Sequence, residues 1–266
     1  MRVTYVHHSG FLIETAAQAY LFDYVSGALP PLRAELPVVV LASHAHRDHY
    51  DPGVFALLRS RGVRQICAVL SRDIPASRRP ADVPVLRVGP GETHELGPGT
   101  RLETLRSTDR GVAFLLTTEE GVVYHAGDLN DWTWDGEPEA DNRRMRERYR
   151  REIDRLRGRR IDVACVPLDP RQEAHEADGL LYFLEAVGAA AVYPMHDWDQ
   201  PAVIARFLQA HPQYAGVIRR SQNDAPGGAP DAAPGDAPGG VPGGAPDAAP
   251  GGARDDAPDD TEATEA

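Results

Sequence analysis

The sequence predicts an α/β layered domain built around a sandwich of mixed β-sheets. The main observation is that apolar runs ending abruptly in an acid or a histidine alternate with amphipathic segments of helical period. A second observation is that residues from about 83 to 124 have the pattern of antiparallel hairpins, with turns at Pro90-Gly91 and Glu120-Gly121. Together these patterns predict sheets that contain both parallel and antiparallel strands.

Three short strand signals open the chain. Residues 3–6 and 11–14 flank a His-His-Ser-Gly turn, which predicts a hairpin, and residues 19–22 follow and end at Asp23. Four later apolar runs lead into His44, Asp128, Asp169 and His196. Runs this apolar are typical of strands buried on both faces. Ligands in such folds gather where the strands end, so these polar residues are candidates for a site.

Four segments have the period and the end signals of helices, namely residues 51–62, 137–158, 177–188 and 200–212. In the first, Pro52 lies near the predicted start and Gly62 at the predicted stop. The second places four apolar residues on one stripe: Met145, Tyr149, Ile153 and Leu156. These helices are the expected covering layers of the sheets.

The acidity of the chain is concentrated at its C-terminal end. The formal net charge is −12, and the residues from Asp224 to Ala266 include eight Asp, two Glu and one Arg, a charge of −9. Residues 1–223 therefore carry −3. The C-terminal segment repeats Ala, Pro, Gly and Asp and has no aromatic residue, so it cannot bury enough apolar surface to offset the entropy of ordering. We predict a folded domain over residues 1–221 and a disordered acidic tail over 222–266.

Charge and hydropathy also limit the classes of partner that the protein is expected to bind. Residues 143–160 contain ten arginines, but acidic residues are interspersed and the core has no net positive charge, so we expect a solvated helix face and no nucleic-acid partner. No stretch approaches the eighteen or so apolar residues of a membrane helix. Cys67 and Cys165 both lie in apolar runs, as reduced thiols do. We expect a cytoplasmic protein that does not engage a membrane, and the sequence leaves its oligomeric state open.

Residues 43–52, SHAHRDHYDP, place four ligand-type side chains within six positions. At the end of a strand, His44 and His46 can face one ion while the next two, Asp48 and His49, turn toward a second. Imidazole together with carboxylate suits Zn²⁺, with Mn or Fe as alternatives. Burying these groups without a metal would leave uncompensated polarity. The stretch therefore predicts part of a centre for one or two metal ions.

The motif H-x-H-x-D-H after a buried strand, followed by a Gly-Asp after a hairpin and a His after a late strand, resembles the metallo-β-lactamase superfamily over about residues 2–218. The opening HHSGFLIE is similar to a branch with sugar-phosphate lactonases and many uncharacterised hydrolases. The resemblance implies an αββα sandwich of two mixed sheets between helical layers. It also implies roles: His44 and His46 on the first metal, Asp48, His49 and His196 on the second, Asp128 bridging both, and Asp23 supporting the metal loop without binding metal.

One departure from the family pattern concerns the first metal. The family usually supplies a further histidine from the loop before the hairpin that leads to the bridging aspartate, and here no histidine lies between His94 and His125. Thr108 occupies the position, with Asp109 beside it. Either Asp109 supplies a carboxylate, which moves the preference toward Fe or Mn, or the first site is weak and the protein holds one ion.

The expected chemistry is hydrolysis. Water bound to Zn²⁺ loses a proton near neutral pH and becomes a nucleophile, so a metal-bound hydroxide attacks a small-molecule ester, lactone or phosphoester. Asp48 is the predicted catalytic residue, orienting the hydroxide or shuttling its proton. Two alternatives are a di-iron redox enzyme of the same fold and a non-catalytic metal-binding protein with a defective first site.

Five further residues are candidates for a substrate pocket, and each has a structural alternative. His8 follows the first strand and is equally well explained as a structural histidine. Trp132 and Trp134 follow Asp128, and the alternative to lining a pocket is that their loop packs on the next helix. Asp169 ends a strand at the same edge, and Arg171 is placed to pair with an anionic substrate or simply with Asp169.

Overall fold

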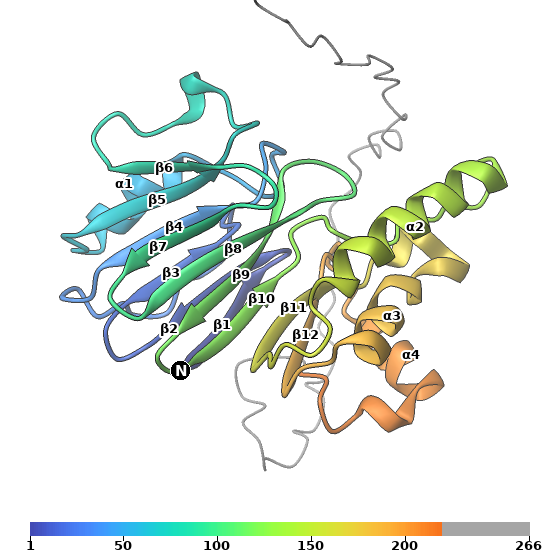
Figure 1. The fold of residues 1–266 in the computed structure, drawn as a ribbon. Coiled ribbons are helices and arrows are strands. Elements are labelled where there is room, and N and C mark those ends of the chain that lie inside the picture. Colours follow the sequence, from blue (N-terminus) through green and yellow to red (C-terminus); the bar gives the residue numbers. More distant parts are fainter. Residues whose placement is uncertain (220–266) are drawn as a thin grey trace, which may run out of the picture. The chain divides into compact units, whose positions relative to one another are not determined.

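The computed structural model describes residues 1–219, in which two six-stranded β-sheets pack face to face (Figure 1). The first sheet has its strands in chain order: β1 (Arg2–His7), β2 (Gly10–Glu14), β3 (Ala19–Phe22), β4 (Val38–Ala42), β5 (Ile66–Ser71) and β6 (Val85–Val88). Strands β1 to β3 pair antiparallel, and β3 to β6 pair parallel. The predicted hairpin at the start of the chain is thereby confirmed.

The second sheet runs in the reverse of chain order: β12 (Ala191–Met195), β11 (Val163–Pro167), β10 (Gly121–His125), β9 (Val112–Thr118), β8 (Thr100–Arg106) and β7 (Thr93–Gly97). Strands β10 to β12 pair parallel, and β7 to β10 pair antiparallel. Both sheets are therefore mixed, as the sequence predicts.

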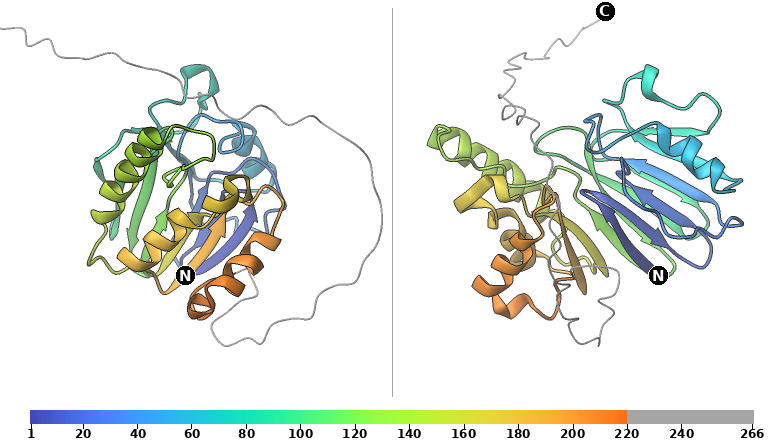
Figure 2. Two further views of the ribbon diagram at one scale, coloured as in Figure 1. Left: turned by 90° about the vertical axis from the view of Figure 1, so that its right-hand side faces the viewer. Right: turned by 180° about the vertical axis from the view of Figure 1, so that it is seen from behind.

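Helices cover the outer face of each sheet. Helix α1 (Gly53–Ser60) packs its buried residues, among them Phe55 and Leu58, on the first sheet. Figures 1 and 2 show that α2 (Glu139–Asp154), α3 (Asp178–Ala186) and α4 (Ala202–Ala210) lie together against the second sheet. The four predicted helices and the αββα layering are confirmed. Three short 3₁₀ turns, at Ala76–Arg78, Pro170–His175 and Pro212–Tyr214, were not predicted.

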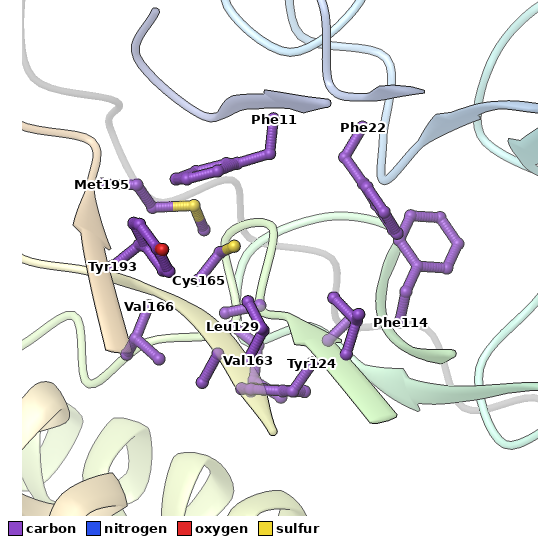
Figure 3. Packing of buried hydrophobic residues seen from close by; sticks show 14 of the residues in the cluster. Phe11, Phe22, Phe114, Tyr124, Leu129, Val163, Cys165, Val166, Tyr193 and Met195 are labelled. Carbon is purple, nitrogen blue, oxygen red and sulfur yellow. The ribbon is translucent and has the colours of Figure 1, made fainter. Parts of the chain in front are cut away.

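The core between the sheets comes from alternate residues of the strands. Phe11 and Phe22 of the first sheet face Phe114 and Tyr193 of the second, with ring centroids 6.0 Å apart in the pairs Phe22–Phe114 and Phe11–Tyr193 (Figure 3). Leu12, the neighbour of Phe11, belongs instead to the core beneath α1. Successive side chains of a strand point to opposite faces, so each sheet is buried on both sides.

One part of the predicted topology is wrong. Residues 83–124 do not form hairpins throughout, because β6 pairs parallel with β5 in the first sheet, with Ala68 opposite Val85. The Pro90-Gly91 turn therefore carries the chain from one sheet to the other, whereas the Glu120-Gly121 turn does join the antiparallel strands β9 and β10. A short apolar run has the same local pattern whichever strand it pairs with, so the sequence could not assign β6 to its sheet.

The predicted tail, residues 222–266, lies outside the described residues, so its disorder and the boundary at residue 221 stay predictions.

Several arginines at the end of α2 and beyond it form ion pairs with acidic residues, including Arg155 with Glu152 and Arg159 with Glu103. Within residues 1–219, each helix is too short or too polar to span a lipid bilayer.

Candidate metal centre

The predicted site residues come from separate loops and converge at one edge of the sandwich. The loop after β4 carries His44, His46, Asp48 and His49, and Asp128 follows β10. His196 follows β12 directly, Asp109 lies between β8 and β9, and His8 lies between β1 and β2. Since these strands end at the same edge, side chains far apart in sequence meet there.

Two glycines allow these loops to approach closely. Gly111 has φ +66°, and a Cβ there would lie 2.0 Å from the carbonyl oxygen of Ser43. Gly127 has φ +51°, and its Cβ would lie 2.7 Å from Cβ of Ser43. Only glycine has both the left-handed conformation at low cost and the necessary space. The loops bearing Asp109 and Asp128 therefore close onto the residue before His44.

The first cluster consists of His44, His46, Asp109 and Asp128, with one potential ligand atom of each lying within 4.8 Å of the others. Nε2 of His44 lies 3.4 Å from Oδ2 of Asp128, and Nδ1 of His46 lies 3.5 Å from Oδ2 of Asp109. His44 is fully buried, whereas the side chains of His46 and Asp109 are 40% and 38% exposed. The carboxylate of Asp109 thus lies beside His46 within the first cluster.

The second cluster consists of His8, Asp48, His49 and His196, whose ligand atoms also lie within 4.8 Å of one another. Oδ2 of Asp48 lies 3.5 Å from Nε2 of His8 and 3.9 Å from Nε2 of both His49 and His196. The three imidazoles are buried, and the Asp48 side chain is 34% exposed. The second cluster is thus accessible to solvent on the side of the Asp48 carboxylate.

Asp128 lies between the two clusters. Its Oδ1 is 3.1 Å from Nε2 of His49 and 3.4 Å from Nε2 of His196, while its Oδ2 faces His44. Burial opposes its charge, but the surrounding imidazoles, His49 first, hold the pKa of Asp128 well below its usual range. One ionised carboxylate therefore presents one oxygen to each cluster.

The donor set fits metal ions. Several buried atoms that face the clusters have no hydrogen-bond partner among the described residues: Nε2 of His8, His44, His49 and His196, and Oδ1 of Asp128. Metal–ligand bonds of about 2.0–2.2 Å at tetrahedral angles place two ligands of one ion about 3.3–3.6 Å apart. Five of the seven separations above, 3.1–3.5 Å, lie close to those values, and the two from Asp48 to His49 and His196 are longer, at 3.9 Å. Buried acceptors that face one another are costly unless a cation lies between them.

Protonation of the imidazoles agrees with this fit. Burial lowers the pKa of His44 to about 4, so its imidazole is neutral near pH 7 and keeps a lone pair for a metal. Burial also lowers the pKa of His8. At His49 burial acts in the same direction, but Asp128 and Asp23 on either side raise its pKa well above its ordinary value. The position of His49 thus favours a positive charge, which a proton or a metal ion supplies.

Asp23 holds the loop of residues 43–49 in place through hydrogen bonds to Ser43 and His49. Its Oδ1 accepts the backbone N–H of Ser43 at 2.7 Å, and its Oδ2 accepts the Ser43 hydroxyl at 2.6 Å and Nδ1–H of His49 at 2.8 Å. The Ser43 hydroxyl oxygen in turn accepts Nδ1–H of His44 at 2.9 Å. Since both histidines donate through Nδ1, both direct the lone pair of Nε2 toward the clusters.

Asp169 has a similar contact with His196 that sequence reasoning did not anticipate. It is fully buried, with Oδ2 3.0 Å from Nδ1 of His196, and it also accepts Nε–H and Nη2–H of Arg171. The ion pair with Arg171 was one of the two predicted alternatives. In the sequence, Asp169 and His196 each follow an apolar run, which was the available sign that they could meet. That the two strands are parallel neighbours, β11 and β12, is visible only in the structure.

The tryptophans lie around His196. Trp132 is buried, donates Nε1–H to the carbonyl oxygen of Asp128 at 2.9 Å and packs edge-on against His196. Its ring stacks on Trp134. Trp198, which sequence reasoning missed, is 39% exposed, packs edge-on against His8 and His196, and carries the Arg171 guanidinium 4.2 Å from its ring centroid. These rings form one side of the centre.

Two other polar residues have structural roles. The Thr108 hydroxyl donates to the carbonyl oxygen of Asn130 at 2.6 Å and accepts the backbone N–H of Asn130 at 3.0 Å. His125, which the sequence left unassigned, donates Nε2–H to the carbonyl oxygen of Ser9 and accepts Gly127 N–H at Nδ1. Because their hydrogen bonds are used within the fold, neither side chain is a free ligand.

Comparison with known proteins agrees with the fold and the site. A family model described as a β-lactamase superfamily domain matches residues 2–139, about half of the chain. A relative from Pyrobaculum calidifontis named UPF0173 metal-dependent hydrolase is 30% identical in an alignment of 146 positions that covers 48% of this chain and 61% of the relative. The match thus spans less than two thirds of that relative.

Solved structures support the fold alone. Igni18, a metallo hydrolase from Ignicoccus hospitalis, aligns with a TM-score of 0.57 at 16% identity, covering 82% of this chain and 93% of its own. CmlA from Streptomyces venezuelae, described as a diiron β-hydroxylase, aligns with a TM-score of 0.55 at 14% identity, covering 81% of this chain and 52% of its own. The chain belongs to the β-lactamase superfamily, and its two-sheet sandwich has the metallo-β-lactamase fold.

Proposed function

We propose that this protein is a metal-dependent hydrolase that holds two divalent ions, one at each cluster, and that both ions are zinc. The observation that carries the proposal is the buried carboxylate of Asp128, which presents one oxygen to each cluster among imidazole nitrogens that have no hydrogen-bond partner within residues 1–219. The relative from Pyrobaculum calidifontis, named a metal-dependent hydrolase, supports the same class of activity.

We assign His44, His46 and Asp109 to the first ion, Asp48, His49 and His196 to the second, and Asp128 to both. A Zn²⁺ ion held there would lower the pKa of bound water toward neutrality and would polarise a carbonyl or phosphoryl oxygen. The side chains of Asp23 and Asp169 hold the imidazoles in the orientation that binding needs.

Asp48 is the residue that we assign to move a proton. Burial opposes its charge, but His8 and His49 hold the pKa of Asp48 below its usual range, so its carboxylate is ionised at neutral pH. Its Oδ2 faces the second cluster, and the partly exposed side chain leaves the other oxygen to accept a proton from an attacking water. We assign Asp128 a binding role only, because each of its oxygens faces imidazole nitrogens of the clusters.

The substrate that we propose is a small anionic molecule with an ester, lactone or phosphoester bond. A cavity of about 590 Å³ opens beside His46, and its charged lining residues are Arg47, Asp51 and Arg78. The Arg78 guanidinium is hydrogen-bonded to the backbone carbonyls of Ala45 and Tyr50, which leaves Arg47 as the arginine available to a substrate. On the other side of the centre, Arg171 lies over the exposed ring of Trp198. Arginine near an open metal centre favours a carboxylate or phosphate group on the substrate.

The first experiment is elemental analysis of the native protein, followed by a panel of lactone and phosphoester substrates. We expect two zinc ions per chain, and turnover that falls at least a hundredfold in Asp48→Ala. A protein that retains metal but has no turnover on any substrate would support the non-catalytic alternative. A protein that binds no metal would overturn the proposal.

A di-iron redox enzyme is the second candidate, and Asp109 is the observation that favours it. Two carboxylates in the first cluster suit iron or manganese better than an all-histidine set does. The structurally similar CmlA is described as a diiron enzyme. Two iron atoms per chain together with a visible absorption band would favour this candidate over the hydrolase.

The unpaired thiols of Cys67 and Cys165 support a cytoplasmic location, which we include in the proposal. Burial raises the pKa of both thiols, so neither is a reactive thiolate.

A further inference from the structure

His8 lies in the tight turn between β1 and β2 and is held there by several contacts. Its backbone has φ +53°, in the left-handed region that non-glycine residues seldom adopt. Its carbonyl oxygen accepts the backbone N–H of His196 at 3.2 Å, and its ring lies 4.2 Å from that of His196. Unusual backbone conformations of this kind are retained where the surrounding structure requires them, and often occur at functional sites.

The imidazole of His8 points into the second cluster. The residue is 7% exposed, and its Nε2 is buried with no hydrogen-bond partner among the described residues. That atom lies 3.5 Å from Oδ2 of Asp48, beyond the usual 2.7–3.2 Å of an N–H···O hydrogen bond. The distance instead matches two ligands on one ion.

We propose that His8 is a protein ligand of the second ion. This inference rests on the proposed function, since it requires that the centre binds metal. The second ion would then have three imidazoles, from His8, His49 and His196, together with Asp48 and one oxygen of Asp128. The first ion would have two imidazoles and two carboxylates.

This assignment makes the two metal sites chemically unequal. Imidazole-rich sites suit Zn²⁺ and Co²⁺, whereas carboxylate-rich sites are more tolerant of Mn²⁺. The second site therefore fills first when zinc or cobalt is added to metal-free protein, and manganese enters the first site more readily than the second.

The test compares His8→Asn and His8→Gln with a neighbouring control, His7→Ala. Asparagine tolerates the left-handed backbone better than most residues but is too short to bind the ion. Glutamine keeps a hydrogen-bond donor for Asp48. His7 is partly exposed and contacts Asp199 and Ser26 outside both clusters, so its loss tests for nonspecific effects of altering the turn.

Each full-length protein is stripped of metal with a chelator and titrated with Co²⁺. Absorption gives the affinity of each site, elemental analysis gives the stoichiometry, and proton NMR of the cobalt-loaded protein gives the hyperfine-shifted imidazole N–H signals. We expect both His8 variants to bind the second ion at least tenfold more weakly and to lose one imidazole signal, while His7→Ala behaves like the wild type.

Unchanged affinity and an unchanged set of imidazole signals in His8→Asn and His8→Gln would overturn the assignment while leaving the metal centre in place. Weaker binding in His8→Asn alone, with His8→Gln like the wild type, would also overturn it, because a hydrogen bond to Asp48 would then suffice. If the wild-type protein itself binds no Co²⁺ or Zn²⁺, the proposed function fails first.

Discussion

Asp169 lies beneath His196 as Asp23 lies beneath His49: in each pair a fully buried carboxylate is within hydrogen-bond distance of Nδ1 of the imidazole, at 3.0 Å and 2.8 Å respectively. In both pairs the carboxylate sets the tautomer and directs Nε2 toward the second cluster. The two supports come from different sheets, Asp23 after β3 and Asp169 after β11. The second cluster is therefore oriented from both halves of the sandwich.

The first prediction concerns Asp169→Asn. The amide has nearly the same shape but lacks the charge that stabilises the donating imidazole, so we expect the second ion to bind about 10–100-fold more weakly. Asp154→Asn, at the far end of α2, is the matched control because that exposed carboxylate pairs with Arg157. Equal metal affinity in the two variants, measured by titration with Co²⁺, would contradict a positioning role for Asp169.

The second prediction concerns Asp109. If its carboxylate binds the first ion, Asp109→Ala lowers the metal content from two ions to one per chain, and Asp109→His restores two ions with a stronger preference for zinc over manganese. The adjacent, exposed Arg110 provides the control substitution Arg110→Ala. Two ions per chain in Asp109→Ala, by elemental analysis, would show that His44, His46 and Asp128 suffice.

The third prediction is that removal of metal lowers thermal stability. Ions that bind only the folded state stabilise it by about 4 kcal/mol when their concentration is about a thousandfold above Kd. In a domain of this size that corresponds to a fall in Tm of about 8–16 °C on chelation. The melting temperature is measured by circular dichroism with and without chelator. A Tm that is the same in both conditions would argue against a metal centre at these buried side chains.

The fourth prediction concerns Trp198, which forms the exposed aromatic side of the centre. Trp198→Asn is chosen because the residue has φ +51°. If the ring binds substrate away from the reacting bond, the substitution should raise KM about tenfold for the substrate found by the panel and change kcat little. Metal content is the control and should not change. A fall in kcat at constant KM would place Trp198 in the chemical step instead.

Much of the fold was predictable because its elements have clear local signals. The stripe of Tyr149 and Ile153 is buried against the second sheet as its helical period predicts. The fully buried run of β4, Val38–Ala42, has the composition of a strand covered on both faces. The antiparallel pairing predicted for the segment that forms β6 is wrong, because the partner of a strand within its sheet is set by contacts between distant segments, and local periodicity does not record them.

The sequence by itself determined which side chains are available for a metal centre and how the motif from His44 to His49 presents them, because that spacing is local. Only the tertiary structure decided the rest. It brought Asp109 to His46, placed His8 in the second cluster and put Asp169 beneath His196. These contacts depend on which strands are neighbours and on how closely Gly111 and Gly127 let the loops approach Ser43. Such relations between distant segments arise only when both sheets have packed.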